Sequence, residues 1–282
     1  MGNPPMSTPG DETSRPESAP SDEPLRPEGE RLELRLRRLS RRGFALGGVA
    51  ALTGLAGWRW LVTRSEEEGV PWPFRRFLGF NERLAQTAFQ PSGTAPEFPR
   101  SAARQPRVNG QIGLDTAIDP AAWRLRVLGR PGEGRAQLFR LEEIKVLPRV
   151  EMTTELKCIE GWSAVVHWTG ARLADLAAQT GLVTRSGRRD DPEDLLRYAA
   201  LETPDAAYYV GLDMASALHP QTLLCYEMDG RPLTPDHGAP LRLVIPVKYG
   251  IRNLKRIGTI RFTDARPADY WAQRGYDWYS GH

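Results

Sequence analysis

The feature that most constrains this chain is an uncharged apolar stretch close to its start. Residues 43–58 (GFALGGVAALTGLAGW) carry no charged side chain and follow a basic segment that ends in Arg41-Arg42. Such a stretch is either an ordinary buried helix or a segment directed to the membrane. The paired arginines directly before it favour a bacterial export signal of the twin-arginine type. A chain exported this way builds its folded body from the residues that follow the signal.

The apolar stretch alone is shorter than the roughly 20 residues that a membrane-spanning helix needs. Extended to Val62 it reaches that length, and Trp58 and Trp60 resemble interfacial anchors at its far end. No A-x-A cleavage pattern follows. We predict a signal or membrane tether over residues 40–62, with a tether favoured and cleavage left open. A cleaved signal and a retained tether would each place the body in the periplasm or at the extracytoplasmic face of the membrane.

The rest of the chain divides by composition. Residues 1–39 are polar and proline-rich and predict a disordered head. Residues 63–106 are rich in Pro, Arg and aromatic residues and predict an irregular connector, which leaves 107–282 as the folded domain. The formal net charge of +3 is too small to indicate nucleic-acid binding by itself.

The body shows both strand and helix patterns without a strict alternation of the two, which favours the α+β class. No internal repeat is present. The aromatic carboxyl-terminal segment, 270–282, is expected to pack over the domain. The predicted strands are 122–128, 150–156, 241–247 and 258–262, a turn is expected at 129–134, and the predicted helices are 141–146 and 171–180, the latter ending at Gly181.

The chain contains two cysteines, Cys158 and Cys225, too few for a disulfide framework or a structural zinc site. A single bond between them stays open from sequence. Cys225 lies among apolar residues and is expected in the core. Cys158 follows a predicted strand and precedes Gly161-Trp162, a position that can project sulfur into a cleft. Most free cysteines are small buried hydrophobes, so the local sequence alone leaves both roles open.

A second segment with chemical potential runs from Arg242 to Arg256 and contains five basic residues. Gly250 would let backbone N–H groups approach a ligand, and Arg and Lys form charge-assisted bonds to phosphate. The segment therefore predicts either a pocket for a phosphorylated cofactor or a solvated basic face.

Three blocks occur in a specific order: CIEGWS from Cys158, WTGARLADL from Trp168, and DHGAPLRLVIPVKYGIRNLKRIGTI from Asp236. Together they resemble the molybdopterin-binding domain of the sulfite oxidase family over roughly residues 105–265. The resemblance extends to the bacterial branch that includes the catalytic subunit of periplasmic methionine-sulfoxide reductase. It implies a mixed-sheet, sulfite-oxidase-type domain that binds molybdenum–molybdopterin.

The resemblance also implies roles for individual residues. Cys158 matches the thiolate ligand of molybdenum, and a soft thiolate suits such a metal. Tyr208 or Tyr209 matches an active-site tyrosine whose phenol could donate a hydrogen bond to the oxo group or the substrate oxygen. Other positions match contacts to the cofactor: Asn109, Thr203, His237, Arg242, Asn253, Leu254 and Lys255.

The activity implied is two-electron oxygen-atom transfer on a sulfoxide or on sulfite, with the sulfoxide favoured. No C-x-x-C-H haem motif is present, so electrons would pass to or from a separate membrane haem protein or cytochrome. Two alternatives remain: a membrane-tethered module that keeps the fold without catalysis, and a polyanion-binding protein using residues 242–256. Nucleic acid is not expected, since export and the lack of interleaved aromatic residues argue against it.

Overall fold

The computed structural model describes residues 28–129, 136–187 and 192–282. The described residues divide into two units, with the boundary between Trp60 and Leu61. Most of the predicted turn at 129–134, and residues 1–27 of the predicted head, lie outside the described residues.

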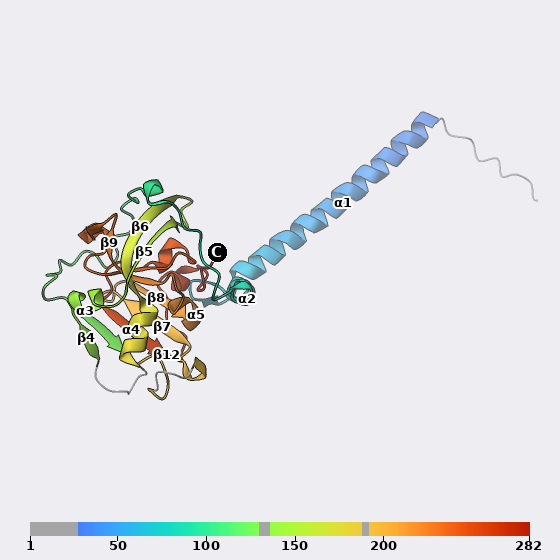
Figure 1. The fold of residues 1–282 in the computed structure, drawn as a ribbon. Helices are drawn as coiled ribbons and strands as arrows, with labels where there is room; N and C mark the ends of the chain where they lie inside the picture. The colour runs from blue at the N-terminus through green and yellow to red at the C-terminus, as the bar shows by residue number, and fades with distance from the viewer. Residues whose placement is uncertain (1–27, 130–135, 188–191) are drawn as a thin grey trace, which may run out of the picture. The chain divides into compact units, whose positions relative to one another are not determined.

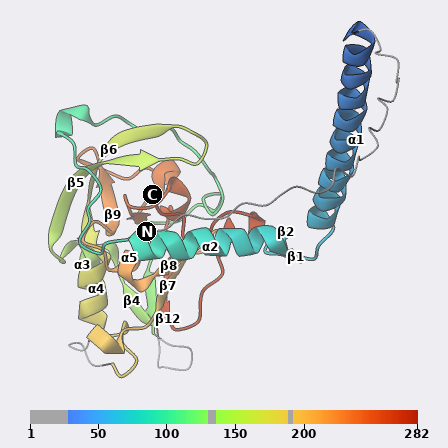
Figure 2. The ribbon, with the colours of Figure 1, turned by 90° about the vertical axis from the view of Figure 1, so that its right-hand side faces the viewer.

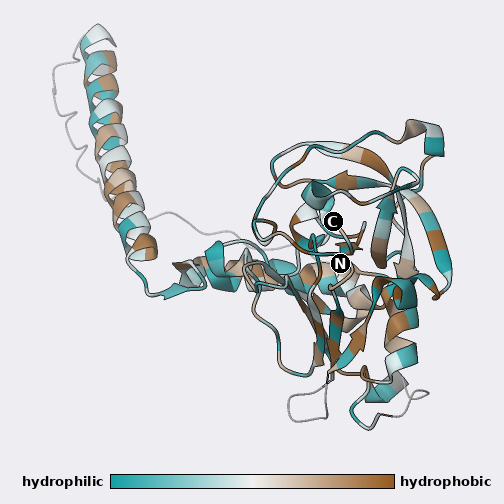
Figure 3. Ribbon diagram, turned by 90° about the vertical axis from the view of Figure 1, so that its left-hand side faces the viewer, coloured by the Kyte–Doolittle hydropathy of each residue, from teal (hydrophilic) through white to brown (hydrophobic). Residues whose placement is uncertain are grey.

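The described part of the first unit is one long helix, α1 (Glu28–Val62), whose last two residues belong to the second unit. Its Leu32–Val62 portion is long and apolar enough to cross a membrane, by length and composition alone. Hydrophilic residues concentrate towards the start of α1 and give way to the apolar stretch (Figure 3). Residues 28–39, expected as part of a disordered head, are helical instead. Leu, Arg and Glu favour helix, and Glu33 and Arg37 form an i,i+4 ion pair at 3.7 Å.

The predicted irregular connector also contains regular structure. A short hairpin of β1 (Glu66–Glu67) and β2 (Val70–Pro71) leads directly into the 17-residue helix α2 (Trp72–Ala88). The prolines of this segment suggested a loop, but one of them occupies the first helical turn, where proline is tolerated. Helix α2 runs along the outside of the second unit (Figure 2).

Two layers of strands, one antiparallel and one mixed, form the body of the second unit (Figure 1). One sheet has the order β10-β9-β6-β5 with β11 also pairing β9, and all its pairs are antiparallel. The other has the order β4-β3-β12-β7-β8, in which β12 and β3 are parallel and the remaining pairs antiparallel. This mixed arrangement confirms the predicted α+β, mixed-sheet class.

The strands of the second unit are β3 (Leu125–Leu128), β4 (Gln137–Phe139), β5 (Arg149–Lys157), β6 (Ser163–Arg172), β7 (Tyr198–Glu202), β8 (Tyr209–Asp213), β9 (Leu223–Met228), β10 (Arg231–Pro232), β11 (Arg242–Val244) and β12 (Thr259–Thr263). Its short helices are α3 (Leu141–Lys145), α4 (Leu173–Thr180) and α5 (Met214–Ala217), with 3-10 turns η1 (Arg100–Ala102), η2 (Pro192–Asp194), η3 (Pro235–His237), η4 (Gly250–Arg252) and η5 (Ala272–Arg274).

The predicted elements of the body all occur, with ends shifted by a few residues. Strands β3, β5, β11 and β12 and helices α3 and α4 lie at the predicted positions. Helix α4 buries Leu173, Leu176 and Ala177 and ends at a left-handed Gly181, as its sequence indicated. One large buried cluster joins residues from both sheets and α4, so the two sheets share a core.

Lys248 is an exception within this core, because its ammonium group is buried with only weak compensation. The side chain is 1% exposed, Nζ lies 3.6 Å from Asp213 Oδ1, and it has no hydrogen-bond partner among the described residues. It lies over the ring of Tyr279. Burial lowers the pKa of Lys248 to about 7.

This burial predicts a specific pH dependence of stability. Between pH about 7 and about 10 the unfolded chain holds a proton on Lys248 that the folded chain lacks, so the free energy of unfolding rises with pH across that window. Replacing Lys248 with Met should remove this rise, making the variant more stable than the wild type near pH 7 by a margin that shrinks towards pH 10. Urea denaturation at several pH values measures the margin; a constant margin would contradict the prediction.

Candidate functional site

A pocket in the second unit brings together residues from six separate parts of the chain. It lies where the β5–β6 turn, the η3–β11 segment and the η4 segment converge. The segment before β3, Tyr208 just before β8, and the carboxyl-terminal segment form further wall. The polar, charged and aromatic side chains that line it are Arg107, Asn109, Cys158, Glu160, Trp162, Tyr208, His237, Arg242, Asn253, Lys255, Trp271 and Tyr276.

Cys158 lies in this pocket immediately after β5 ends at Lys157, as its sequence position suggested. Its N–H donates to the Trp162 carbonyl at 2.9 Å, which fixes the turn. The Asn109 side-chain amide lies 3.7 Å from the Cys158 sulfur. Gly250 allows the η4 segment to approach closely, since a Cβ there would lie 3.3 Å from the Lys157 carbonyl. The two cysteines are unbonded, and Cys225 is fully buried as predicted.

Cationic groups form the wall of the pocket beside His237. Arg242 is 3% exposed, donates to the carbonyls of His237 and Asn253, and lies 4.9 Å over the Trp168 ring. Burial lowers the pKa of Arg242 to about 10, so it stays protonated near neutral pH. Burial likewise lowers the pKa of Lys255 to about 8, and its ammonium donates to the carbonyls of Asn109, Gly110 and Asp236.

Among the described residues, no carboxylate forms an ion pair with Arg242 or Lys255; the Asp236 carboxylate acts on Lys255 only by a longer-range attraction that favours the charged ammonium. The Nε atom of Arg242 and the Nε2 atom of His237 are also buried without a hydrogen-bond partner there. Burial and the neighbouring cations lower the pKa of His237 and favour its neutral form. Unpaired buried polar groups are costly, so this wall fits an anionic, hydrogen-bonding ligand.

The other basic residues of the 242–256 segment have structural partners. Arg252 is fully buried and pairs with Asp269, and the Arg256 guanidinium, 4% exposed, donates to the carbonyls of Leu114 and Thr116. Lys248 is in the core. The structure therefore lacks the solvated basic face that the polyanion-binding alternative requires, because tertiary packing takes these cations out of solvent.

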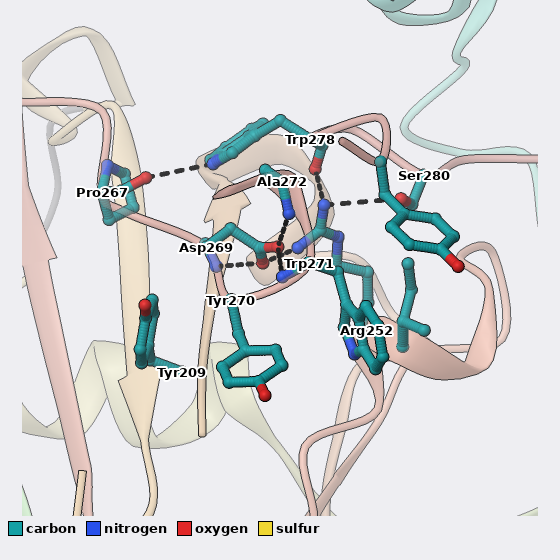
Figure 4. A network of polar contacts seen from close by, with 12 residues as sticks. Tyr209, Arg252, Pro267, Asp269, Tyr270, Trp271, Ala272, Trp278 and Ser280 are labelled. Atoms are coloured by element: carbon teal, nitrogen blue, oxygen red, sulfur yellow. Dashed lines mark hydrogen bonds and ion pairs between the residues drawn. The ribbon is translucent and has the colours of Figure 1, made fainter. Parts of the chain in front are cut away.

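The Arg252–Asp269 pair is the centre of a network that positions the carboxyl-terminal part of the pocket wall (Figure 4). The Asp269 carboxylate accepts hydrogen bonds from the backbone N–H groups of Trp271 and Ala272 at 3.0 and 2.9 Å. Arg252 also donates to the carbonyls of Asp277 and Trp278. Trp271 and Tyr276, which line the pocket, are thereby held next to η4; the sequence predicted only that this aromatic segment packs over the domain.

A family model described as the oxidoreductase molybdopterin binding domain matches residues 112–271. The chain belongs to this family. Molybdopterin-binding oxidoreductases of the sulfite oxidase type were the family expected from the three sequence blocks, and that expectation is confirmed.

Individual relatives support the same assignment. The chain is 33% identical over 258 residues to a candidate protein-methionine-sulfoxide reductase subunit, YedZ1, of Azospira oryzae, covering 90% of both chains. It is 35% identical over 159 residues to the protein-methionine-sulfoxide reductase catalytic subunit MsrP of Xanthomonas campestris, covering 53% of this chain and 47% of the relative.

Human mitochondrial sulfite oxidase is 30% identical over 186 residues, covering 58% of this chain and 33% of its own. The match to the Azospira relative therefore spans nearly the whole chain, whereas MsrP and sulfite oxidase are matched over about half and a third of their length. Among solved structures, the sulfane dehydrogenase SoxCD of Paracoccus pantotrophus aligns with a TM-score of 0.45 and 20% identity over 54% of this chain and 40% of that one.

The pocket fits the molybdopterin cofactor of the family. Its cationic wall, in which Arg242 has no carboxylate partner among the described residues, suits a phosphate; the unpaired His237 nitrogen suits a polar ring, and the Cys158 sulfur lies in the same pocket. A cysteine sulfur, an imidazole whose neutral form is favoured and buried cations are groups that suit a phosphorylated, sulfur-containing metal cofactor.

Most of the predicted cofactor contacts meet in this pocket, but not all. Asn109, His237, Arg242, Asn253 and Lys255 line it with Cys158. By contrast, Leu254 is a fully buried core residue whose carbonyl accepts a hydrogen bond from Leu243 N–H. Leu254 is therefore not among the residues that line the pocket.

Only one of the two candidate tyrosines lies in the pocket, and Thr203 lies outside it. Tyr208 lines the pocket, and its hydroxyl donates to the Ile251 carbonyl at 2.6 Å; burial raises its pKa to about 12. Tyr209 lies outside the pocket, with its hydroxyl bonded to Gln273. Thr203 is buried outside the pocket-lining set, where its hydroxyl accepts the Tyr208 N–H at 3.1 Å and holds the turn before β8.

Because Arg242 has no carboxylate partner among the described residues, replacing it should affect cofactor binding and protein stability differently. Replacing Arg242 with Met keeps similar volume but removes the cation, so we expect at least about a tenfold loss of retained molybdopterin. The cofactor-free variant should be at least as stable as the cofactor-free wild type, because the buried charge itself is unfavourable. Pterin fluorescence after acid release and thermal melts measure the two effects.

The control is Arg126→Met, which replaces an exposed arginine on β3. A drop in stability of Arg242→Met with unchanged pterin content would mean that Arg242 is a structural residue rather than part of the cofactor site.

Proposed function

We propose that this chain is the catalytic component of an exported molybdenum enzyme that reduces sulfoxides. The observation that carries the proposal is the composition of the pocket around Cys158: a cysteine sulfur, a wall that contains the buried Arg242, and one exposed cation and one exposed anion, Arg107 and Glu160, at its solvent-facing side, called the mouth below. The methionine-sulfoxide reductases among the relatives support the same choice of substrate.

Within this proposal, Cys158 ligates the molybdenum through its thiolate. Arg242 and Lys255 hold the phosphate end of the cofactor, and His237, Asn109 and Asn253 bind its polar edges. When bound, molybdenum–molybdopterin supplies the two-electron oxygen-atom transfer chemistry. The protein's own contribution is to orient the cofactor and to restrict what reaches it.

Tyr208 serves as a support in this scheme. Its proton is engaged with the Ile251 carbonyl, and its raised pKa keeps the phenol protonated across the physiological range. It therefore holds η4 in place next to Cys158. A catalytic role for Tyr209 would require it to leave its bond to Gln273.

The mouth of the pocket favours a neutral substrate over an anionic one. Arg107 lies 6.0 Å from the Trp162 ring, while the Glu160 carboxylate accepts hydrogen bonds from Asn109 and from the Trp162 indole at 3.1 and 3.2 Å. A site that attracts the sulfite dianion needs an excess of positive charge facing the metal. One cation and one anion at the mouth provide no such excess, whereas a sulfoxide needs none.

The proposal also includes export and an electron partner. The twin-arginine pair within α1, directly before its apolar stretch, and the length of α1 support a body on the extracytoplasmic side of a membrane, tethered by residues 43–62. The basic residues lie before the apolar stretch, as the positive-inside rule requires for this orientation. Because the chain has no haem-attachment motif, a membrane haem protein or a cytochrome would supply the electrons.

The first test concerns the metal. Wild-type protein from a molybdenum-sufficient bacterial host should contain about one molybdenum per chain, and Cys158→Ser should alter the sulfur-to-metal absorption and abolish turnover. Elemental analysis and visible spectroscopy measure both. The control is Cys225→Ser, which removes the other, buried thiol without touching the pocket. Metal-free wild type from a host that loads related enzymes would overturn the catalytic proposal.

The second test concerns the substrate. Reduction of methionine sulfoxide with a dye donor should proceed with kcat/KM nearly independent of salt, and sulfite oxidation should be at least about 100-fold slower. Glu160→Gln should raise kcat/KM for sulfite about fivefold, because it removes roughly 1 kcal/mol of repulsion from a dianion about 8 Å away. The same variant should leave kcat/KM for the sulfoxide within about twofold of the wild-type value. Faster turnover of sulfite than of sulfoxide by the wild type would refute the assignment.

A further inference from the structure

Helix α2 presents an apolar stripe to solvent, although its other side is firmly attached to the protein. Phe77, Phe80 and Leu84 are 63%, 55% and 60% exposed. Their i, i+3, i+7 spacing places them on one side of the helix. No other described helix or strand of the second unit exposes more than one large apolar side chain.

The attachment on the opposite side shows that this stripe is not a poorly packed core face. The Arg75 guanidinium donates to the carbonyls of Glu68, Ala272 and Tyr276 at 2.6 to 3.1 Å. Glu82 is 7% exposed and pairs with Arg266 at 2.7 Å. Polar contacts thus fix the orientation of α2, and that orientation directs the phenylalanines outward.

Charge on the exposed side of α2 matches a phospholipid surface. Arg76 and Arg83 are exposed next to the stripe, and Glu82, the only acidic residue in the helix, is buried and paired. The three glutamates of the preceding β1–β2 segment lie outside the helix. An apolar stripe flanked by arginines is the pattern of a helix that lies in the membrane interface.

Chain length limits how far α2 can be from a membrane. Nine residues separate the end of α1 at Val62 from the start of α2 at Trp72. Even fully extended, they would span at most about 35 Å, and the hairpin within them shortens the reach. If α1 remains as a tether, α2 is confined near the surface where α1 emerges.

We propose that α2 is an interfacial membrane-binding helix whose Phe77, Phe80 and Leu84 insert into the bilayer surface. The proposal rests on the tether included in the proposed function. Lipid contact along α2 would fix the orientation of the catalytic unit relative to the membrane, beyond what a flexible tether alone provides.

The test is photocrosslinking of the full-length chain in proteoliposomes of phosphatidylethanolamine and phosphatidylglycerol. A photoreactive phenylalanine analogue replaces Phe77 or Phe80 in turn. One matched control places it at Gln86, an exposed position on another side of α2, and a second at Leu138 on β4, which is 58% exposed. Adducts are identified by mass spectrometry.

We expect lipid adducts at positions 77 and 80 at least about five times more abundant than at either control. Equal yields at all four positions, or adducts at 77 and 80 mainly to protein, including a second copy of this chain, would overturn the proposal. Intact mass of the cellular protein tests the tether separately. If the mass shows that α1 is removed, the proposed tether is wrong. The labelled chains without α1 are then added to vesicles. There, a fivefold excess of lipid adducts at positions 77 and 80 over the controls supports the role of α2, and a smaller excess refutes it.

Discussion

The buried ion pair between Arg252 and Asp269 is the interaction on which the architecture of the pocket depends. Arg252 belongs to the η4 turn that approaches Cys158, and Asp269 organises the carboxyl-terminal segment through the N–H groups of Trp271 and Ala272. One interaction therefore joins two separate segments of the pocket wall. Removing one partner of such a fully buried pair costs roughly 3–5 kcal/mol, since it leaves an uncompensated charge.

The contrast between Arg252 and Arg242 distinguishes structural cations from binding cations. Both are arginines of one basic segment, both are buried, and burial lowers the pKa of each to about 10. Arg252 has a carboxylate and several carbonyls around it, whereas the described residues supply Arg242 with carbonyls alone. A buried charge without a counter-charge is unfavourable unless a ligand provides one, so Arg242 is the better indicator of the cofactor site.

The same carboxyl-terminal segment also connects the pocket to α2. Arg75 of α2 donates to the carbonyls of Ala272 and Tyr276, which are neighbours of Trp271 in the pocket wall. A helix that contacts lipid through its outer side would thus be connected by hydrogen bonds to the wall of the catalytic pocket. This arrangement would fix which way the pocket faces relative to a membrane-bound electron donor.

The sequence alone determined the α+β class, the main strands of the body, the family and the position of Cys158 at a strand end. These are local properties, because apolar periodicity and turn residues act over a few positions and the three family blocks are contiguous. Helix α2 was missed because its prolines suggested a loop, and the helical residues 28–39 were missed because the polar composition of the head suggested disorder.

Only the tertiary structure decided which basic residues of the 242–256 segment face the pocket, which tyrosine lies in it and which aromatic residues close it. Those outcomes depend on partners far apart in the chain, such as Asn109 with Cys158 and Lys255 with the Asn109 carbonyl. No local pattern encodes such pairings. Whether a buried charge is compensated follows from where the whole chain places its neighbours, which is why this part of the site required the folded structure.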